Sequence, residues 1–492
     1  MRNSVFIFYG YSKHQSALDI LMTLISSLHL PEAPDSPIYL PKRSRKTPRI
    51  TILLGVNGTG KSRILRSILD QQIASFQSTS TDVKDATRAP LREGPCRVIA
   101  VSSTTNDRFP AKSSLSEPRY KTRFNIDTYD YIGPRTSRNL ISRRHSLESF
   151  ISAVLRTTKI NSKQAKFLNR LCKKTSISTH IQVYLSSSLN SQINFDPRNF
   201  REWLMAEIGT PGLVDKELER LLESNEVKYL LPKLQEFLGR YQSLVIKSKE
   251  IKNRNKEAYP FFIDIGNQIL LDTPGTTPEI IELALRLKIL RITDVVFNNI
   301  SSQAVKEMRP DDFSAGQWGL FSSLATLALI RENRSLILID EPETGLHPSW
   351  QREFIEDLQD SLVESKDCHV ILATHSPLIV GGIKDSDGEV VVLRPNNNFD
   401  NISMKLLPAP TGWESSDVLE EIFDLPSTRS PELENLVNMA LQYIARGVKE
   451  NYDKLSALAC KLRFYLDKLP EDDSLSPVIE TIISVTEKSG KQ

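Results

Sequence analysis

The sequence predicts an α/β fold with a mixed sheet, an inserted helical lobe and a helical C-terminal extension. Two runs predict strands: residues 50–54 form an apolar run, and residues 336–339 have the continuous aliphatic composition of a buried parallel strand. Apolar residues recur at helical spacing between these runs, over residues 218–241, and after them, over residues 418–469. The chain of 492 residues is long enough for one large domain with insertions or for two to three domains.

The elements before the first buried run are predicted from helical spacing and proline content. Residues 17–30 place leucine and isoleucine side chains on one side of a helix. Residues 31–41 contain repeated prolines, which predict a loop. A basic stretch, residues 42–49, then leads into the strand at residues 50–54 and is expected to be a solvated connector.

A glycine-rich loop follows that strand. Residues 55–62 have the sequence GVNGTGKS and precede an amphipathic run, so strand, loop and helix come in the order that a phosphate-binding P-loop requires. The glycines let successive N–H groups turn toward one anion, and the helix N-terminus adds partial positive charge. Lys61 would reach the β- and γ-phosphates of ATP, and Ser62 would coordinate Mg²⁺. Arg63 is either a helix-surface residue or a phosphate contact. The predicted nucleotide contacts are Asn57, Gly58, Thr59, Gly60, Lys61, Ser62 and Arg63.

A long segment separates the P-loop from the later motifs. After a short strand-like run at residues 97–101, helical spacing recurs beyond residue 139, and residues 261–271 return to strand-like composition. We therefore expect an insertion within one head domain. The predicted division is residues 1–138 for the N-terminal half of the head with the P-loop, 139–298 for an inserted, mainly helical lobe, 299–410 for the C-terminal half, and 411–492 for a helical, partner-docking region.

The second half of the chain carries three further motifs in a fixed order. Ser314, Gly316 and Gln317 precede an apolar helix. The aliphatic strand then ends in two acids, Asp340 and Glu341, and is followed by ETGLHP at residues 343–348. The next strand, residues 369–373, ends at Thr-His-Ser, with His375 in the centre. Each motif alone could be a turn or a surface group, whereas their order after a P-loop favours a nucleotide site.

The order of these motifs resembles the ATPase head of the ABC superfamily, on the SMC and RecF side, and the ETGLHP run resembles RecF-like and OLD-like proteins. The resemblance implies that two heads enclose two ATP molecules. Each ATP would lie between the P-loop of one chain and the signature of the other, which Ser314, Gly316 and Gln317 form. No clear Q-loop glutamine follows the run at residues 97–101, so that contact stays unassigned.

Roles for the acids and the histidine follow from their chemistry in such a head. Asp340 would hold Mg²⁺ directly or through water. Glu341 would position and polarise the attacking water, and His375 would sense or stabilise the γ-phosphate. With Lys61, Glu341 and His375 are therefore the predicted catalytic residues, and Ser62 with Asp340 the predicted metal ligands.

A narrower resemblance comes from residues 101–110 and 129–135, which look like prokaryotic anti-phage ATPases of the Septu type, including those attached to retrons. It implies an oligomeric ATPase that holds a separate HNH nuclease in check until infection, with the retron reverse transcriptase and its msDNA as further partners. Residues after the acidic turn at 385–387 are too few and too helical for a Toprim domain, and the seven histidines form no HNH-like cluster. We therefore expect no nuclease site in this chain.

Composition limits the remaining alternatives. The four cysteines are scattered and form no CxxC pair, which argues against a zinc site and a disulfide framework. No stretch is long and apolar enough for a membrane span, so a cytoplasmic protein without membrane contact is expected. The net charge of +3 gives no global argument for nucleic acid. Local basic patches at residues 42–49, 143–145 and 247–256 keep a RecF- or SMC-like repair ATPase open, and an ATP-bound scaffold without significant turnover is the third hypothesis.

Overall fold

The computed structural model describes most of the chain and divides it into two units, Met1–Ser415 and Ser416–Gln492, which are treated separately below. The described residues are 24–25, 27–30, 33–41, 48–81, 94–112, 124, 126–136, 140–157, 160–188, 193, 196–208, 222, 225–244, 246–247, 257–266, 269–271, 276–299, 306–384, 386–395, 402–423, 425, 427–470 and 472–489.

A seven-stranded sheet forms the centre of the first unit, with strand order β15-β14-β3-β13-β12-β4-β5. All neighbouring strands run parallel except β14 and β15, so the sheet is mixed and the predicted α/β fold is confirmed. Its strands are β3 (Arg49–Gly55), β4 (Arg97–Ser102), β5 (Tyr129–Ile132), β12 (Ser335–Asp340), β13 (His369–Thr374), β14 (Gly388–Pro395) and β15 (Ile402–Pro408).

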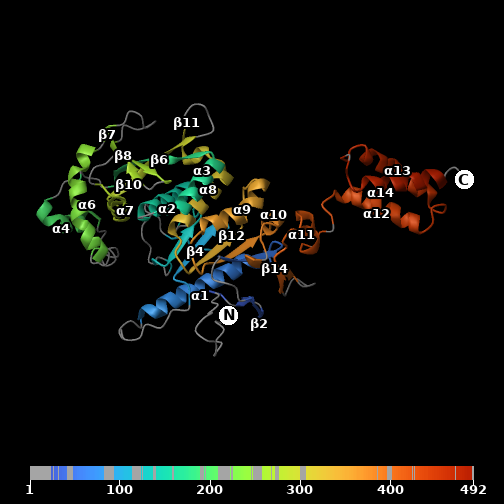
Figure 1. The fold of residues 1–492 in the computed structure, drawn as a ribbon, viewed down its shortest axis with the longest axis horizontal. Coiled ribbons are helices and arrows are strands. Elements are labelled where there is room, and N and C mark those ends of the chain that lie inside the picture. The colour runs from blue at the N-terminus through green and yellow to red at the C-terminus, as the bar shows by residue number, and fades with distance from the viewer. Residues whose placement is uncertain are drawn as a thin grey trace. The chain divides into compact units, whose positions relative to one another are not determined.

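Helices cover both faces of this sheet (Figure 1). On one face, α1 (Lys61–Thr81) buries apolar side chains such as Ile64 and Ile68 against Leu338 and Ile371. On the other face lie α2 (Arg143–Arg156), α8 (Ala315–Ile330) and α9 (Pro348–Ser361), with the short α10 (Pro377–Val380) packed on α9. Because both faces are covered, β3, β12 and β13 are buried along their whole length, which explains why the centres of β12 and β13 are entirely apolar and why β3 is mainly so.

The segment between α2 and α8 contains helices and also an antiparallel sheet, which was not predicted and which extends past residue 298, the predicted end of the insertion. Its strand order is β11-β10-β6-β8-β7, with β9 paired to β8. In β6, buried Ile181, Val183 and Leu185 alternate with less buried neighbours, the period of a strand with one covered face. The elements are α3 (Ser162–Lys174), β6 (Ile177–Ser187), η1 (Pro197–Asn199), α4 (Phe200–Ile208), α6 (Asn225–Leu244), β7 (Ile246–Lys247), β8 (Glu257–Asp264), β9 (Ile269–Leu271), α7 (Pro278–Arg286), β10 (Leu290–Asn299), β11 (Lys306–Met308) and η2 (Pro310–Asp312).

The N-terminal prediction is wrong where the structure describes it. Instead of a helix ending at residue 30 and a proline loop, β1 (Ser27–Leu30) and β2 (Ala33–Tyr39) pair as an antiparallel hairpin. A two-stranded sheet has two free edges, and a proline, which lacks the N–H donor, is tolerated on an edge. The prolines therefore do not exclude a strand here.

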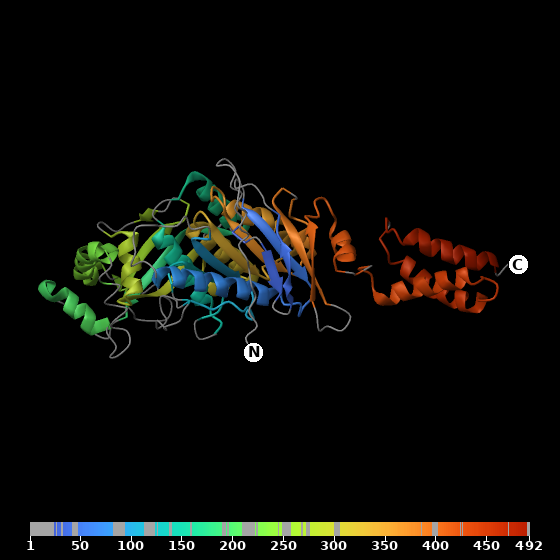
Figure 2. The same cartoon turned by 90° about the horizontal axis from the view of Figure 1, so that it is seen from below.

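The second unit is a set of three helices, α12 (Pro431–Ala445), α13 (Tyr452–Leu466) and α14 (Ser476–Ser489), and α11 (Ser415–Glu421) begins at the boundary (Figure 2). Their core includes Leu433, Leu455, Leu462 and Ile479. The predicted helical C-terminal extension is thus present. Among the described residues, no helix combines the length and apolarity that a membrane span needs.

Gly388 offers a test of the sheet. A Cβ at this position would lie 1.8 Å from the carbonyl oxygen of Ile50 in the neighbouring β3. Gly388→Ala should therefore force β14 away from the P-loop strand and lower stability by about 2 kcal/mol or more, seen as a lower thermal midpoint. Gly239→Ala in α6 meets nothing within 4 Å and should leave the midpoint unchanged or slightly higher. Equal midpoints for the two variants would contradict this packing.

Candidate functional site

Four adjacent parallel strands end at one edge of the central sheet. In the order β3, β13, β12, β4, these strands lead into the P-loop, His375, the pair Asp340–Glu341, and Ser102. The register pairs Asp340 with both Ala373 and Ser102, so the strand ends are level. Ligand sites of open α/β sheets lie at such carboxyl ends. Motifs that are up to about 300 residues apart in sequence are thereby brought to one place.

The P-loop has the backbone that its glycines predict. Gly58 and Gly60 have positive φ angles of 86° and 84°, which side chains rarely permit. Thr59 Oγ1 donates to the carbonyl oxygen of Val56 at 2.9 Å, and Lys61 Nζ donates to that of Gly55 at 2.8 Å. Asn57 is exposed, and the Arg63 guanidinium lies beside Gly60. The loop is thus held open by its own contacts, in a form that fits a phosphate chain.

Ser62 and Asp340 meet across this site. Ser62 Oγ donates to Asp340 Oδ1 at 3.1 Å, and Asp340 is only 2% exposed. Burial raises the pKa of Asp340 to about 7; the Ser62 hydrogen bond opposes the shift and the charge of Glu341 adds to it. A buried carboxylate beside a hydroxyl supplies the hard oxygen ligands that Mg²⁺ prefers. These two residues therefore fit the predicted metal position.

Lys61, His375 and Glu341 form a hydrogen-bonded chain. Lys61 Nζ lies 3.3 Å from His375 Nδ1, and His375 Nε2 lies 3.3 Å from Glu341 Oε1. Because an ammonium group can only donate, Nδ1 accepts, and a neutral imidazole then carries its proton on Nε2, directed at Glu341. Burial and the nearby Lys61 lower the pKa of His375, which favours this neutral form. Burial also lowers the pKa of Lys61 to about 8, against the attraction of the nearby acids.

The turn after β12 depends on a residue to which sequence reasoning gave no role. Glu341 has a positive φ of 47°, unusual for a side chain of its size, and its N–H donates to the carbonyl oxygen of Ala373. Two residues later, Glu343 Oε1 accepts a 2.6 Å hydrogen bond from the backbone N–H of His375. Glu343 therefore connects the two strand ends. The sequence feature that could have indicated this role is the third acid in Asp-Glu-Pro-Glu, residues 340–343.

The signature residues lie at the start of α8. Ser314 and Gln317 form a capping box, with Gln317 N donating to Ser314 Oγ at 3.2 Å and Ser314 N to Gln317 Oε1 at 3.0 Å. Gly316 is buried, and a Cβ there would lie 2.1 Å from the carbonyl oxygen of Gly345. The signature thus packs on the turn that follows β12, while Ser314 itself stays exposed.

The two segments behind the narrower resemblance are in direct contact. Tyr131 donates its hydroxyl to Asp107 Oδ2 at 2.9 Å, and Arg135 Nε donates to the same oxygen at 3.2 Å. The Asp107 side chain has no exposed surface. A Cβ at Gly133 would lie 2.3 Å from the Tyr131 hydroxyl, so the turn requires glycine. This cluster fixes the loop after β4, where a Q-loop would be expected, and Asp107 has no free oxygen for a metal there.

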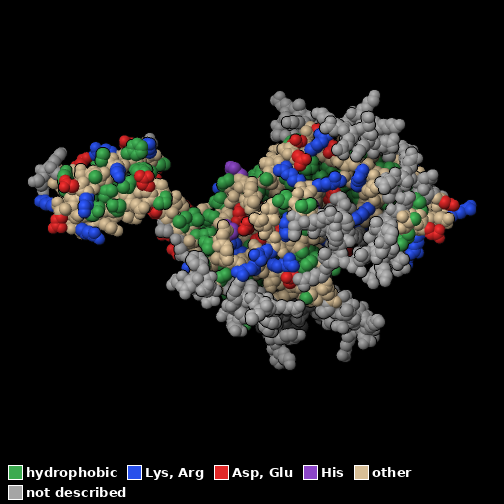
Figure 3. All heavy atoms as spheres, turned by 180° about the vertical axis from the view of Figure 1, so that it is seen from behind, with side chains coloured by type: hydrophobic (Ala, Val, Ile, Leu, Met, Phe, Trp, Pro, Cys, Tyr) green, Lys and Arg blue, Asp and Glu red, His purple; other side chains and the backbone are tan. Residues whose placement is uncertain are grey.

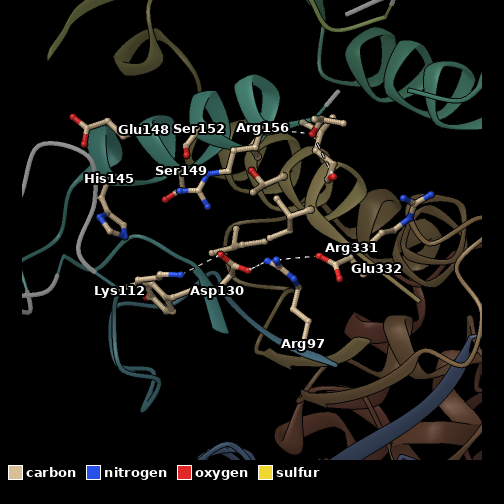
Figure 4. A pocket seen from close by; sticks show the side chains of 17 residues that line it. Arg97, Lys112, Asp130, His145, Glu148, Ser149, Ser152, Arg156, Arg331 and Glu332 are labelled. Atoms are coloured by element: carbon tan, nitrogen blue, oxygen red, sulfur yellow. Dashed lines mark hydrogen bonds and ion pairs between the residues drawn. The ribbon is translucent and has the colours of Figure 1, made fainter. Parts of the chain in front are cut away.

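A cavity of about 330 Å³ lies apart from these residues, between β5, α2 and the end of α8 (Figure 4). Asp130 sits in it between Lys112 and Arg97, which also pairs with Glu332 at 3.0 Å. Arg97 begins β4, whereas Ser102, which pairs with Asp340, ends it. Arg97 is therefore at the opposite end of β4 from the predicted nucleotide contacts, and the cavity extends from there along β5 to Ile132, which pairs with Val101.

Direct contacts therefore join Lys61 to His375, His375 to Glu341, and Ser62 to Asp340, and Lys61 also donates to the carbonyl oxygen of Gly55 in the P-loop. The signature is held by other contacts, to Gly345 and within its own capping box. The arrangement can bind a phosphate chain and a divalent cation and can place a carboxylate and a histidine beside them.

Comparisons with known proteins support this assignment. A family model described as "AAA domain, putative AbiEii toxin, Type IV TA system" matches residues 247–381, which include the signature, Asp340 and His375. The retron Vc95 probable ATPase of Vibrio cholerae serotype O1 biovar El Tor is 23% identical over 440 residues, 81% of this chain and 80% of that protein. The retron Ec83 probable ATPase of Escherichia coli is 24% identical over 78% of this chain and 72% of its own length.

A shorter match is to a Septu protein, and two solved structures also align with the chain. Septu protein PtuA of Bacillus thuringiensis is 31% identical over 106 residues, 21% of this chain and 25% of that protein. Among solved structures, UvrA2 from Deinococcus radiodurans covers 74% of this chain at 13% identity and the SMC head bound to the C-winged helix domain of ScpA covers 76% at 12%, with 34% and 93% of their own chains aligned. Both have a TM-score of 0.25, so the fold assignment depends on the sheet order instead. With the retron and Septu relatives, the motif order confirms that this chain resembles the ABC-like ATPases of prokaryotic defence systems.

Proposed function

We propose that this chain binds and hydrolyses ATP with Mg²⁺, slowly, and that as an oligomer it controls a separate effector nuclease, expected to be of the HNH type, in anti-phage defence. The observation that carries the proposal is the contact chain Lys61–His375–Glu341 beside the Ser62–Asp340 pair, all at the ends of adjacent strands. A structural role alone would not require a buried lysine, a buried carboxylate and a histidine to meet behind a P-loop.

Each residue has a role in the proposed reaction. Mg²⁺, when bound, would neutralise charge on the phosphates. Ser62 and Asp340 would hold it, and Lys61 with the P-loop N–H groups would hold the phosphates. Glu341 would accept the proton of the attacking water, and the Nε2–H of His375, now directed at Glu341, would be available to orient that carboxylate or the γ-phosphate.

A second copy of the chain would complete the site. The exposed Ser314 and the N-terminal N–H groups of α8 would meet the γ-phosphate bound by the partner's P-loop. The buried Gly316 brings that end of α8 into contact with Gly345 and so aims it in a fixed direction. Hydrolysis would therefore require association, as in the ABC-type heads that the motifs resemble.

Control of an effector is inferred from the relatives and from the C-terminal unit. The relatives that cover most of this chain are named as retron ATPases. The three C-terminal helices carry large apolar side chains at exposed positions, among them Met439, Leu441 and Phe464, and Figure 3 shows apolar side chains between charged ones on this unit. Such a mixed surface suits a protein partner. The nuclease, and with it a retron reverse transcriptase and msDNA, are the partners we propose.

A RecF- or SMC-like repair ATPase is the second candidate. Of its three basic patches, residues 42–47 and 248–256 lie outside the described part of the chain. In the third, the Arg143 guanidinium bonds to backbone carbonyls, whereas Arg144 is about half exposed. The basic patches therefore give this candidate less support than the retron relatives give the first.

Glu341→Gln tests hydrolysis against a scaffold role. The amide cannot accept the proton of water, so turnover should fall by about a hundredfold or more while ATP binding persists. The rate of phosphate release and the ATP dissociation constant, measured side by side, separate the two effects. Glu356→Gln, on the exposed side of α9, is the matched control and should keep the native rate. A native rate in Glu341→Gln would favour ATP as a structural ligand only.

The Mg²⁺ requirement should depend on pH. Because the pKa of Asp340 is raised to about 7, protons compete with the cation below that pH and the carboxylate is free above it. The Mg²⁺ concentration for half-maximal ATPase rate should therefore fall about tenfold from pH 6 to pH 8. In Asp340→Asn the requirement should be high at every pH. A requirement that is flat across this range in the native protein would refute the shifted carboxyl.

Affinity purification tests the partner. Glu341→Gln, expressed with its native gene neighbours, should accumulate in the ATP-bound state, and mass spectrometry should then identify a nuclease or a retron component. A matched preparation truncated after residue 415 should lose that component, because the C-terminal unit is the proposed docking region. Recovery of DNA and repair proteins instead would favour the second candidate.

A further inference from the structure

We infer that Arg143, the first residue of α2, is a positioning residue for the signature motif; the inference rests on the proposed ATPase function. Arg143 Nη1 donates hydrogen bonds to the carbonyl oxygens of Pro310 and Phe313, both at 2.9 Å. Pro310 begins the η2 turn, and Phe313 immediately precedes Ser314. One guanidinium nitrogen thus joins both ends of the short segment that leads into the signature.

The first turn of α2 also contacts the signature from its other side. Trp318, two residues after Gly316, donates its indole Nε1–H to Ser146 Oγ at 2.8 Å, in a buried position. Ser146 Oγ in turn donates to the carbonyl oxygen of Arg143 at 2.9 Å. The rings of Phe313 and Trp318 are stacked, with centroids 6.0 Å apart and an angle of 21° between planes. Residues on both sides of Ser314 are therefore attached to the same helical turn.

The contacts of Arg143 fix the approach of the turn that precedes α8, which the capping box does not fix. The Ser314–Gln317 box fixes the start of α8 but leaves open how the preceding turn approaches it. Charge-assisted hydrogen bonds from a planar guanidinium fix distance and direction together. Loss of Arg143 would leave two backbone carbonyls without their partner, and the Ser314 side chain would lose its fixed orientation toward a second copy of the chain.

The segment before α2 is attached at the predicted nucleotide site. Arg135 and Tyr131 bond to Asp107 in the loop after β4, the strand whose last residue pairs with Asp340. The N–H of Ser142 donates to the carbonyl oxygen of Pro134 at 2.8 Å and closes the connection between β5 and α2. A single short stretch therefore contacts the loop beside one nucleotide site and the signature that would face another.

Arg144 provides a matched control because it is adjacent to Arg143 in sequence, whereas its side chain bonds to other residues than the signature segment. Its Nη2 donates to the carbonyl oxygen of Ile292 in β10 at 2.7 Å, and its Nε pairs with Glu148 at 2.9 Å. Both arginines thus bridge α2 to a backbone carbonyl of another element, and only Arg143 reaches the signature. Replacing either removes one positive charge from the same turn of the same helix.

The experiment compares Arg143→Ala, Arg143→Lys and Arg144→Ala in the full chain. Arg143→Ala should lower kcat about tenfold to a hundredfold, since small misplacements of reacting groups have effects of that size. Its ATP dissociation constant should stay within about twofold of the native value, because the P-loop is intact. Arg143→Lys should restore part of the rate, and Arg144→Ala should keep it. Hydrogen exchange of the amides in residues 306–318 should be faster in Arg143→Ala alone.

Each outcome decides between explanations. Equal rates and equal exchange in Arg143→Ala and Arg144→Ala would overturn the inference, as would a loss of ATP affinity that matches the loss of rate. A native protein that binds ATP without hydrolysing it would instead refute the proposed function. In that case faster exchange in Arg143→Ala with reduced ATP-dependent association would still support the positioning role, and unchanged exchange would reject it.

Discussion

The register between β3, β13 and β14 is the constraint on which the site depends, because it sets the P-loop level with His375. A buried polar network fixes this register at the opposite end of the strands. Arg49 pairs with Glu389 at 2.8 Å, and the Thr51 hydroxyl bonds to Glu389 and lies 3.0 Å from His369 Nε2. Burial holds the pKa of His369 well below its usual value, so the ring is neutral.

The buried polar network specifies the register of the strands more than it adds to the stability of the folded protein. A slip of one residue would turn its side chains to the other face of the sheet and leave an arginine and a glutamate buried apart. Removing one member of a buried ion pair costs about 3–5 kcal/mol, whereas the intact pair is often no better than apolar residues of equal volume. The network therefore excludes wrong registers, and the correct register places the predicted catalytic motifs side by side.

Local sequence patterns predicted which residues the structure brings together at the strand ends, because these residues belong to short motifs. The P-loop, Asp340 and His375 each follow a strand whose aliphatic composition is visible without a structure, and parallel pairing alone then brings the strand ends together. Contacts between distant segments gave no such signal. The pairing of β6 with β10 joins residues that are more than 100 positions apart in the sequence. The packing of Gly316 on Gly345 cannot be recognised in the sequence, which shows only two glycines. Asp107 and Arg135 were singled out as parts of motifs, but their contact could not be.

The contact between Gly316 and Gly345 connects the turn that carries Glu341 to the start of α8. Gly345 lies four residues after Glu341, in a turn with two positive φ angles, and its carbonyl oxygen touches Gly316 without any side chain between them. Closely packed backbone cannot absorb a shift as a flexible side chain can. A movement of the Glu341 turn would therefore displace the start of α8, which α2 holds from its other side. In an assembly of two heads, a change at the nucleotide bound by one chain would therefore shift that chain's own signature motif, which would contact the nucleotide of the neighbouring chain.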